Sequence, residues 1–175
     1  MTPNNAEFHR LVSAAINSSP PPDEQLLSEL SSTDQVLQIR ALSVFLGGVV
    51  VLLKGQEDLI TAGGDVWKVQ TQGSPRRCGG QGDLLAGSLG VATHWSISRT
   101  NTSGSPGNGY IMQNRESLVE GMIPDFDRDA IIKASILSSG VVRTASRLAF
   151  SVHGRSTTTP DIIQLIGRAF SEVTE

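Results

Sequence analysis

The sequence has little of several features that define whole classes of protein. It contains one cysteine, Cys78, which excludes an internal disulfide and favours a reducing compartment. Its longest apolar run, 45–53, includes two glycines and is far shorter than the roughly 20 residues of a membrane span. A net charge of −3 gives no basic field for nucleic acid or an anionic membrane. Residues 1–7 lack the basic start and apolar core of a secretory leader. We therefore expect a cytoplasmic protein that binds neither membranes nor nucleic acid.

What the sequence does contain fits one globular domain. Of its 175 residues, 38% are hydrophobic and 18 are glycine, which is close to the norm for soluble proteins. A chain of this length buries roughly 70% of its unfolded surface. We expect a single domain over 1–175. The segment 100–109 is rich in Ser, Thr, Asn and Gly, and predicts a mobile surface insertion.

Hydrophobic periodicity predicts several helices. Asn4 and Glu7 have the spacing of a capping box, and apolar residues recur at helical intervals to about Ile16. A short second helix at 26–30 stands alone or joins a longer one at 35–46. The same spacing, with glycine and proline as stop signals, predicts further helices at 83–96, 128–152 and 160–173.

Only about three strands are predicted. The run 49–53 is short, aliphatic and unbroken, which is typical of a strand buried on both faces. The segments 58–61 and 66–70 flank a glycine-containing turn, and the second alternates as a hairpin strand does. The order of elements predicts an α/β fold with a layer of helices on a sheet. Three strands are few for so many helices.

The segment 79–83, Gly-Gly-Gln-Gly-Asp, is the most informative in the chain. It ends a glycine-rich loop, 73–82, that leads directly into a helix. Glycines let successive backbone amides turn toward one point, and a helix start adds unpaired N–H groups, so this pattern predicts a phosphate site. No Gly-Lys-Ser/Thr follows, so it is not a Walker A loop, and an acid at the helix start argues against the dinucleotide fingerprint.

Asp83 allows two interpretations. A carboxylate beside bound phosphates is repelled, but it is well placed to take a proton from a hydroxyl that attacks a γ-phosphate. Alternatively, Asp83 is only a first-turn acid that the helix dipole favours. The pattern alone leaves both open.

Three cations belong to the same segments. Lys54 follows the buried strand, where ligand residues are common in α/β sheets, and Arg76 and Arg77 lie in the glycine loop. They converge on one anion, or they are ordinary solvated charges. Pro75 has no N–H and donates nothing to a phosphate.

Other chemistry-bearing residues predict less. Cys78 is better explained as a small packed residue than as a nucleophile, and His9, His94 and His153 show no metal-ligand spacing. Two helices are rich in small residues, which favours close backbone packing; a flat adenine slot between them is the alternative.

Several segments together resemble one enzyme family. They are Thr2–Leu11, Lys54–Asp58, Gly73–Asp83, Leu84–Gly90 and Gly154–Thr158. The chain resembles the ATP-dependent NAD(P)H-hydrate dehydratases of the ribokinase-like superfamily over nearly its whole length, except 100–109. The glycine-aspartate motif alone would indicate only the superfamily.

The resemblance implies a fold, a reaction and site residues. The fold would be a ribokinase-like three-layer sandwich, truncated at the amino-terminal side. The reaction would be ATP-dependent dehydration of the S-epimer of hydrated NADH or NADPH, with Asp83 as base and Mg²⁺ bridging the phosphates. ATP would contact Lys54, Gly55, Gln56, Glu57, Asp58, Gly73, Ser74, Pro75, Arg76, Arg77, Cys78, Gly79, Gly80, Gln81 and Gly82. The hydrate would contact Asn4, Asn5, Ala6, Glu7, Phe8, His9, Arg10 and Asp83.

The chain departs from the family by lacking its long amino-terminal part, which holds most of the parallel sheet. This explains the small number of strands, and it predicts that the strand at 49–53 has an unpaired edge. Two other functions stay open: a ribokinase-like small-molecule kinase, and a non-catalytic nucleotide-binding fragment. The oligomeric state and the choice between the NADH and NADPH hydrates are not predicted.

Overall fold

The computed structural model describes residues 1–102 and 125–175. The elements in chain order are α1 (Asn5–Ile16), α2 (Glu24–Leu30), α3 (Gln35–Phe45), β1 (Val51–Leu53), β2 (Asp58–Thr61), β3 (Val66–Val69), α4 (Gln81–Thr102), α5 (Asp125–His153), the 3-10 turn η2 (Gly154–Ser156), α6 (Thr159–Gln164) and α7 (Ile166–Thr174). The predicted mixed α/β class is confirmed. Helix α4 continues past its expected end to Thr102, and the rest of the insertion expected at 100–109 lies outside the described residues.

The first helix begins at the predicted capping box. The Asn4 side chain accepts a hydrogen bond from the Glu7 N–H at 2.9 Å, and the Glu7 carboxylate accepts one from the Asn4 N–H at 2.7 Å. Both donors would otherwise be unpaired at the helix start. The cap sets α1 so that Phe8 and Val12 enter the core.

The three strands form an antiparallel sheet in the order β1-β2-β3. Leu52 lies opposite Ile60, and Ile60 lies opposite Trp67. The predicted hairpin is confirmed, with Thr61 and Val66 paired at its turn. All three residues of β1 are buried, as expected for a strand covered on both faces.

The outer edge of β1 is not bare, so the expectation of an unpaired edge was wrong. Met1 donates its ammonium to the Val50 carbonyl at 2.7 Å, and the Met1 carbonyl accepts from the Leu52 N–H at 2.9 Å. The Pro3 carbonyl accepts from the Lys54 N–H at 3.0 Å. This is the hydrogen-bond pattern of a parallel pair, and Pro3 is tolerated because it lies on an edge.

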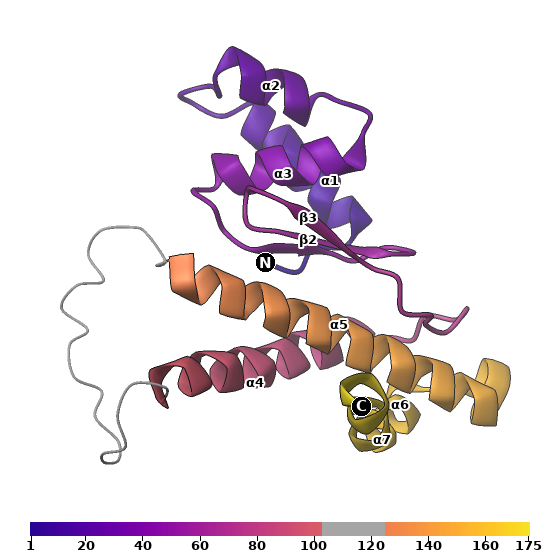
Figure 1. The fold of residues 1–175 in the computed structure, drawn as a ribbon. Coiled ribbons are helices and arrows are strands. Elements are labelled where there is room, and N and C mark those ends of the chain that lie inside the picture. The colour runs from indigo at the N-terminus through magenta and orange to yellow at the C-terminus, as the bar shows by residue number, and fades with distance from the viewer. Residues whose placement is uncertain (103–124) are drawn as a thin grey trace.

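Helices cover both faces of the sheet. Figure 1 shows α1, α2 and α3 on one side of the strands and α5 with α4 on the other. Side chains along β1 alternate between these layers: Val51 and Leu53 pack with α1 and α3, whereas Leu52 packs with α4 and α5. Each fully buried aliphatic side chain contributes about 1.5–3 kcal/mol to folding. The sheet is therefore held by apolar contacts from both sides.

The carboxy-terminal end differs from the expectation of one helix at 160–173. It forms two helices, α6 and α7, separated at Leu165, whose backbone leaves the helical region at φ −102° and ψ 1°. The break lets Ile162 of α6 and Ala169 of α7 both pack into one apolar cluster with α5. Over the described residues, no helix is long and apolar enough to cross a bilayer.

Candidate functional site

The glycine loop ends where α4 begins. Gly80 precedes the helix with φ +85°, a conformation that favours glycine, and its carbonyl accepts the first helical hydrogen bond from the Leu84 N–H at 3.0 Å. The N–H groups of Gly82 and Asp83 have no acceptor within the described part of the chain. Unpaired amides at a helix start, with the positive end of its dipole, favour a bound anion.

Lys54 lies beside these amides. A Cβ built on Gly82 would be 3.6 Å from the Lys54 Nζ, so the ammonium lies next to the start of α4. Among the described residues, no carboxylate forms a salt bridge with Lys54. A cation at the positive end of a helix is unfavourable unless an anion is shared between them. This arrangement supports the anion interpretation of Lys54 over that of a solvated charge.

Asp83 is exposed in the first turn of α4, one residue after Gly82. Its carboxylate accepts no side-chain hydrogen bond among the described residues. An exposed acid beside an anion site can receive a proton from a substrate hydroxyl. The exposed carboxylate is compatible with both interpretations of Asp83, as a proton acceptor and as a first-turn acid.

The carboxy-terminal segment holds the glycine loop in place. The Cys78 thiol donates to the Thr157 carbonyl at 3.1 Å, and the Thr159 hydroxyl donates to the Gly79 carbonyl at 2.5 Å. The bond from the Cys78 thiol fits the expectation that Cys78 is a packed residue.

Two further contacts complete this anchoring. The Gln81 amide donates to the Ser146 hydroxyl of α5 at 2.5 Å, and Arg76 donates to the Arg155 carbonyl. Arg76 is thus engaged in holding the loop, whereas Arg77 is exposed and makes no polar contact within the described part of the chain. Of the three cations, Lys54 is the one whose side chain is recorded next to the start of α4 in the described part of the chain, and convergence of all three on one anion stays a prediction.

Asp58, at the start of β2, is buried and surrounded by donors. Its Oδ1 accepts from the Gly55 N–H at 2.9 Å and from Arg143 at 3.0 Å, and its Oδ2 accepts from the Ser139 hydroxyl at 2.6 Å. The carboxylate therefore fixes the loop after β1 onto α5, which holds Lys54 in place.

A comparison with known proteins decides the family. The model of the NAD(P)H-hydrate dehydratase family matches residues 1–168. This chain belongs to the NAD(P)H-hydrate dehydratase family. Three of the segments that carry the sequence resemblance, 54–58, 73–83 and 154–158, lie together at the start of α4, through Lys54 beside Gly82 and the hydrogen bond between Cys78 and Thr157.

Its relatives in the family are longer. ATP-dependent (S)-NAD(P)H-hydrate dehydratases that it matches include those of Danio rerio (38% identical; 100% of this chain, 44% of the relative), Vitis vinifera (35%; 99% and 41%) and Homo sapiens (35%; 100% and 42%). The chain spans about two fifths of the length of the curated relatives it matches.

The segment expected to contact the hydrate, 4–10, has mixed surroundings. The Asn4 and Glu7 side chains cap α1, and Phe8 is fully buried in the core with the His9 ring 5.9 Å away. The Asn5 side chain accepts from Gln35 at 2.9 Å. Ala6, His9 and Arg10 are exposed.

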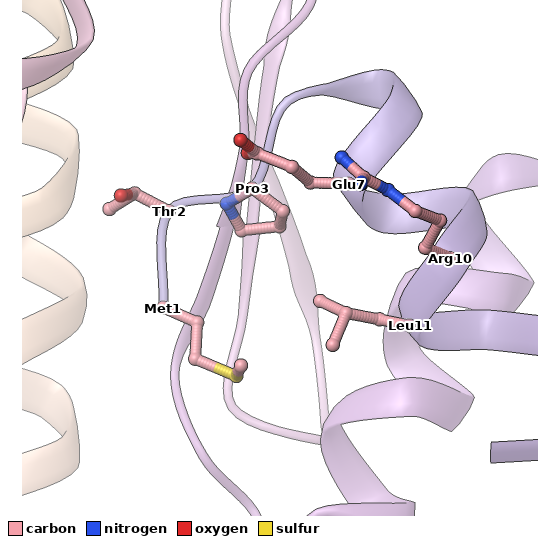
Figure 2. Close-up of a pocket in the computed structure, with 6 residues that line it drawn as sticks. All are labelled: Met1, Thr2, Pro3, Glu7, Arg10 and Leu11. Carbon is pink, nitrogen blue, oxygen red and sulfur yellow. The ribbon is translucent and has the colours of Figure 1, made fainter. Parts of the chain in front are cut away.

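An open pocket of about 560 Å³ lies at the amino-terminal end of α1. Figure 2 shows Met1, Thr2 and Pro3 on the extended segment, with Glu7, Arg10 and Leu11 projecting from α1. Pro3 is also the residue whose carbonyl holds the Lys54 amide. The extended segment 1–3 therefore lines this pocket and also pairs with the strand that leads to Lys54.

Sequence reasoning missed the α5 side of the site. Ser139, Arg143 and Ser146 all contact the predicted loops, yet their helix was interpreted as closely packed or as one wall of an adenine slot, and none of the three was predicted to hold the loops. One signal was present: Ser139 and Arg143 are four residues apart, so they share a helix face, and a charged residue on a small-residue face needs partners.

Proposed function

We propose that this chain carries the nucleotide side of an ATP-dependent dehydratase that repairs the S-epimer of hydrated NADH or NADPH. The observation that supports this most is the Lys54 ammonium beside the start of α4, where neither it nor the amides of Gly82 and Asp83 have a partner among the described residues. These groups suit the negative charge of a transferring phosphoryl group. The helices on both faces of the sheet are consistent with a partial ribokinase-like sandwich.

The proposed reaction has two stages. Asp83 accepts the proton of the ring hydroxyl while the hydroxyl oxygen bonds to the γ-phosphorus. The bond between the γ-phosphorus and the oxygen that it shares with the β-phosphate breaks, and this releases ADP. The carbon–oxygen bond to the new phosphate then breaks, driven by the lone pair of the ring nitrogen. Loss of a proton from the adjacent ring carbon restores the reduced nicotinamide. Water is a poor leaving group, so phosphorylation makes the elimination feasible.

Magnesium fits this site only as a partner of the nucleotide. Within residues 1–102 and 125–175, no group of three or more His, Cys, Asp or Glu side chains could hold a metal ion. Mg²⁺ in such enzymes keeps several waters and uses one or two carboxylates together with substrate phosphates. When bound, it would neutralise phosphate charge.

The substrate side rests on the pocket at α1. Its lining residue Pro3 is hydrogen-bonded to the Lys54 amide, and the exposed Arg10 gives the pocket a cation that suits the phosphates of a nicotinamide nucleotide. The relatives are more than twice as long as this chain, so the full reaction is proposed for an enzyme to which this chain contributes one part.

The test is ATP-dependent recovery of reduced-nicotinamide absorbance from NADH hydrate, with ATP affinity measured in parallel. We expect Asp83→Asn to lower turnover at least about 100-fold while ATP affinity stays within about threefold, because the residue moves a proton and does not hold phosphate. The matched control is Asp65→Asn, in the exposed hairpin turn. Turnover unchanged in Asp83→Asn would exclude Asp83 as the base. ATP binding without recovery in the parent chain would favour a non-catalytic nucleotide-binding fragment.

A further inference from the structure

Arg143 of α5 joins two separate parts of the backbone, at 55–56 and at Thr71, and also pairs with the Asp58 side chain. Its Nε donates to the Thr71 carbonyl at 2.6 Å, just after β3. Its Nη1 pairs with Asp58 at 3.0 Å and makes a longer contact of 3.5 Å to the Gly55 carbonyl. Its Nη2 donates to the Gln56 carbonyl. All three nitrogens of the guanidinium are therefore used, in a side chain that is only 18% exposed.

The arrangement depends on an arginine. Its planar fork presents five N–H donors in fixed directions, and a lysine ammonium at the same place cannot reach several separated carbonyls at once. Asp58, with a side chain 7% exposed, balances the charge. A buried pair with complete hydrogen bonding specifies a geometry more than it adds stability.

The orientation of two peptide units follows from these contacts. The carbonyls of Gly55 and Gln56 face the guanidinium. In a trans peptide the N–H points opposite to the carbonyl of the same unit, so the N–H groups of Gln56 and Glu57 face away from Arg143. Neither N–H has an acceptor among the residues that the structure describes, and both residues are exposed.

We propose that Arg143 is a positioning residue that sets the backbone amides of Gln56 and Glu57 as a pair of anion donors beside Lys54. Adjacent amides turned the same way form a concave anion-binding site. The start of α4 also lies beside Lys54, whose Nζ is 3.6 Å from a Cβ built on Gly82. The ligand class is the phosphate chain of ATP, so this inference rests on the proposed function.

The experiment compares Arg143→Gln and Arg143→Lys with the control Arg147→Gln. Arg147 lies one turn further along α5 and pairs with Glu172 at the surface. Affinity for Mg·ATP is measured by calorimetry, and the backbone order of Gln56 and Glu57 by ¹⁵N relaxation. In Arg143→Gln we expect the order parameters to fall from about 0.85 to below about 0.6. We expect the Kd for Mg·ATP to rise about tenfold. Arg147→Gln should change neither.

Each outcome is decisive. Unchanged loop order in a folded Arg143→Gln chain overturns the proposal, and so does unchanged ATP affinity despite a disordered loop. If the parent chain does not bind ATP, the proposed function fails, and the relaxation data alone decide the positioning role. If Arg143→Gln does not fold, Arg143→Lys decides, because its ammonium keeps the pair with Asp58 but cannot hold the Thr71 and Gln56 carbonyls together. Loop order and ATP affinity equal to the parent in that variant would overturn the proposal.

Discussion

Gly55 shows how closely one residue can be constrained. A Cβ at this position would lie 2.6 Å from the carbonyl oxygen of Glu57, which is a backbone atom and cannot move aside cheaply. Asp58 of β2 holds the N–H of Gly55 in this tight turn, and Arg143 of α5 holds its carbonyl. Any side chain at Gly55 must therefore open the turn. This would displace the amides of Gln56 and Glu57.

We predict that Gly55→Ala weakens ATP binding about tenfold and lowers the free energy of unfolding by about 1–3 kcal/mol, because the turn must distort. Gly64→Ala is the matched control, since a Cβ there meets nothing within 4 Å. Calorimetry and urea unfolding measure the two effects. Equal behaviour of the two variants would show that the turn adapts without strain.

At the scale of the element, the start of α6 depends on a single carboxylate. The Asp161 carboxylate accepts from the Thr158 hydroxyl at 2.6 Å and from the Thr158 N–H at 2.8 Å. These hydrogen bonds, first from the side chain and then from the backbone, lower the pKa of Asp161 below the ordinary value of 3.8, with a smaller contribution from His153. Thr159, the first residue of α6, holds the Gly79 carbonyl, so this cap borders the glycine loop.

The sign of the pH effect follows from the lowered pKa. The ionised Asp161 carboxylate stabilises the folded chain at pH values above its pKa in the unfolded chain. This stabilisation is lost as the pH falls through the pKa of Asp161 in the folded chain, which places the loss below about pH 4. We predict that Asp161→Asn removes this part of the acid sensitivity, measured as the urea midpoint from pH 6 to pH 2.5. Asp129→Asn, at an exposed position on α5, should keep the parent profile.

Local signals in the sequence predicted most elements. Features that depend on contacts between distant residues were not predicted. The capping box at Asn4, the hairpin and the buried β1 follow from spacing within a few residues, so they could be derived. The break at Leu165 depends on packing against α5, and the pairing of residues 1–3 with β1 depends on a partner about fifty residues away. Neither leaves a pattern in its own segment.

The site divides in the same way. The glycine loop, Lys54 and Asp83 were found because glycine patterns and the family resemblance are readable along the chain. Arg143 and Ser139 were not, since their role appears only when α5 packs on the sheet. Phe8 was expected at the hydrate site from the family resemblance, whereas the structure buries its side chain completely in the core.

At the scale of the whole molecule, residues 1–3 protect the sheet. They cover the edge of β1 with three backbone hydrogen bonds, and the helical layers cover both faces. Unpaired edges are templates for association with other chains.

We predict that removing residues 1–3 speeds amide exchange at Leu52 and Lys54, because both amides lose their acceptors. We also expect concentration-dependent self-association through the bared edge. Exchange followed by NMR and sedimentation velocity measure these effects. A shortened chain that stays monomeric with slow exchange would mean that α1 and the neighbouring layers protect the edge unaided.

The contacts of Arg143 also bear on the order of folding. They join residues 72 to 88 positions apart, from Thr71 back to Gly55, so they close only after most of the chain has been synthesised. Closing such long loops costs entropy before any contact repays it, which makes long-range pairings slow to form. The hairpin and the first three helices form from local contacts. Competence to bind nucleotide would thus be acquired last, when α5 docks.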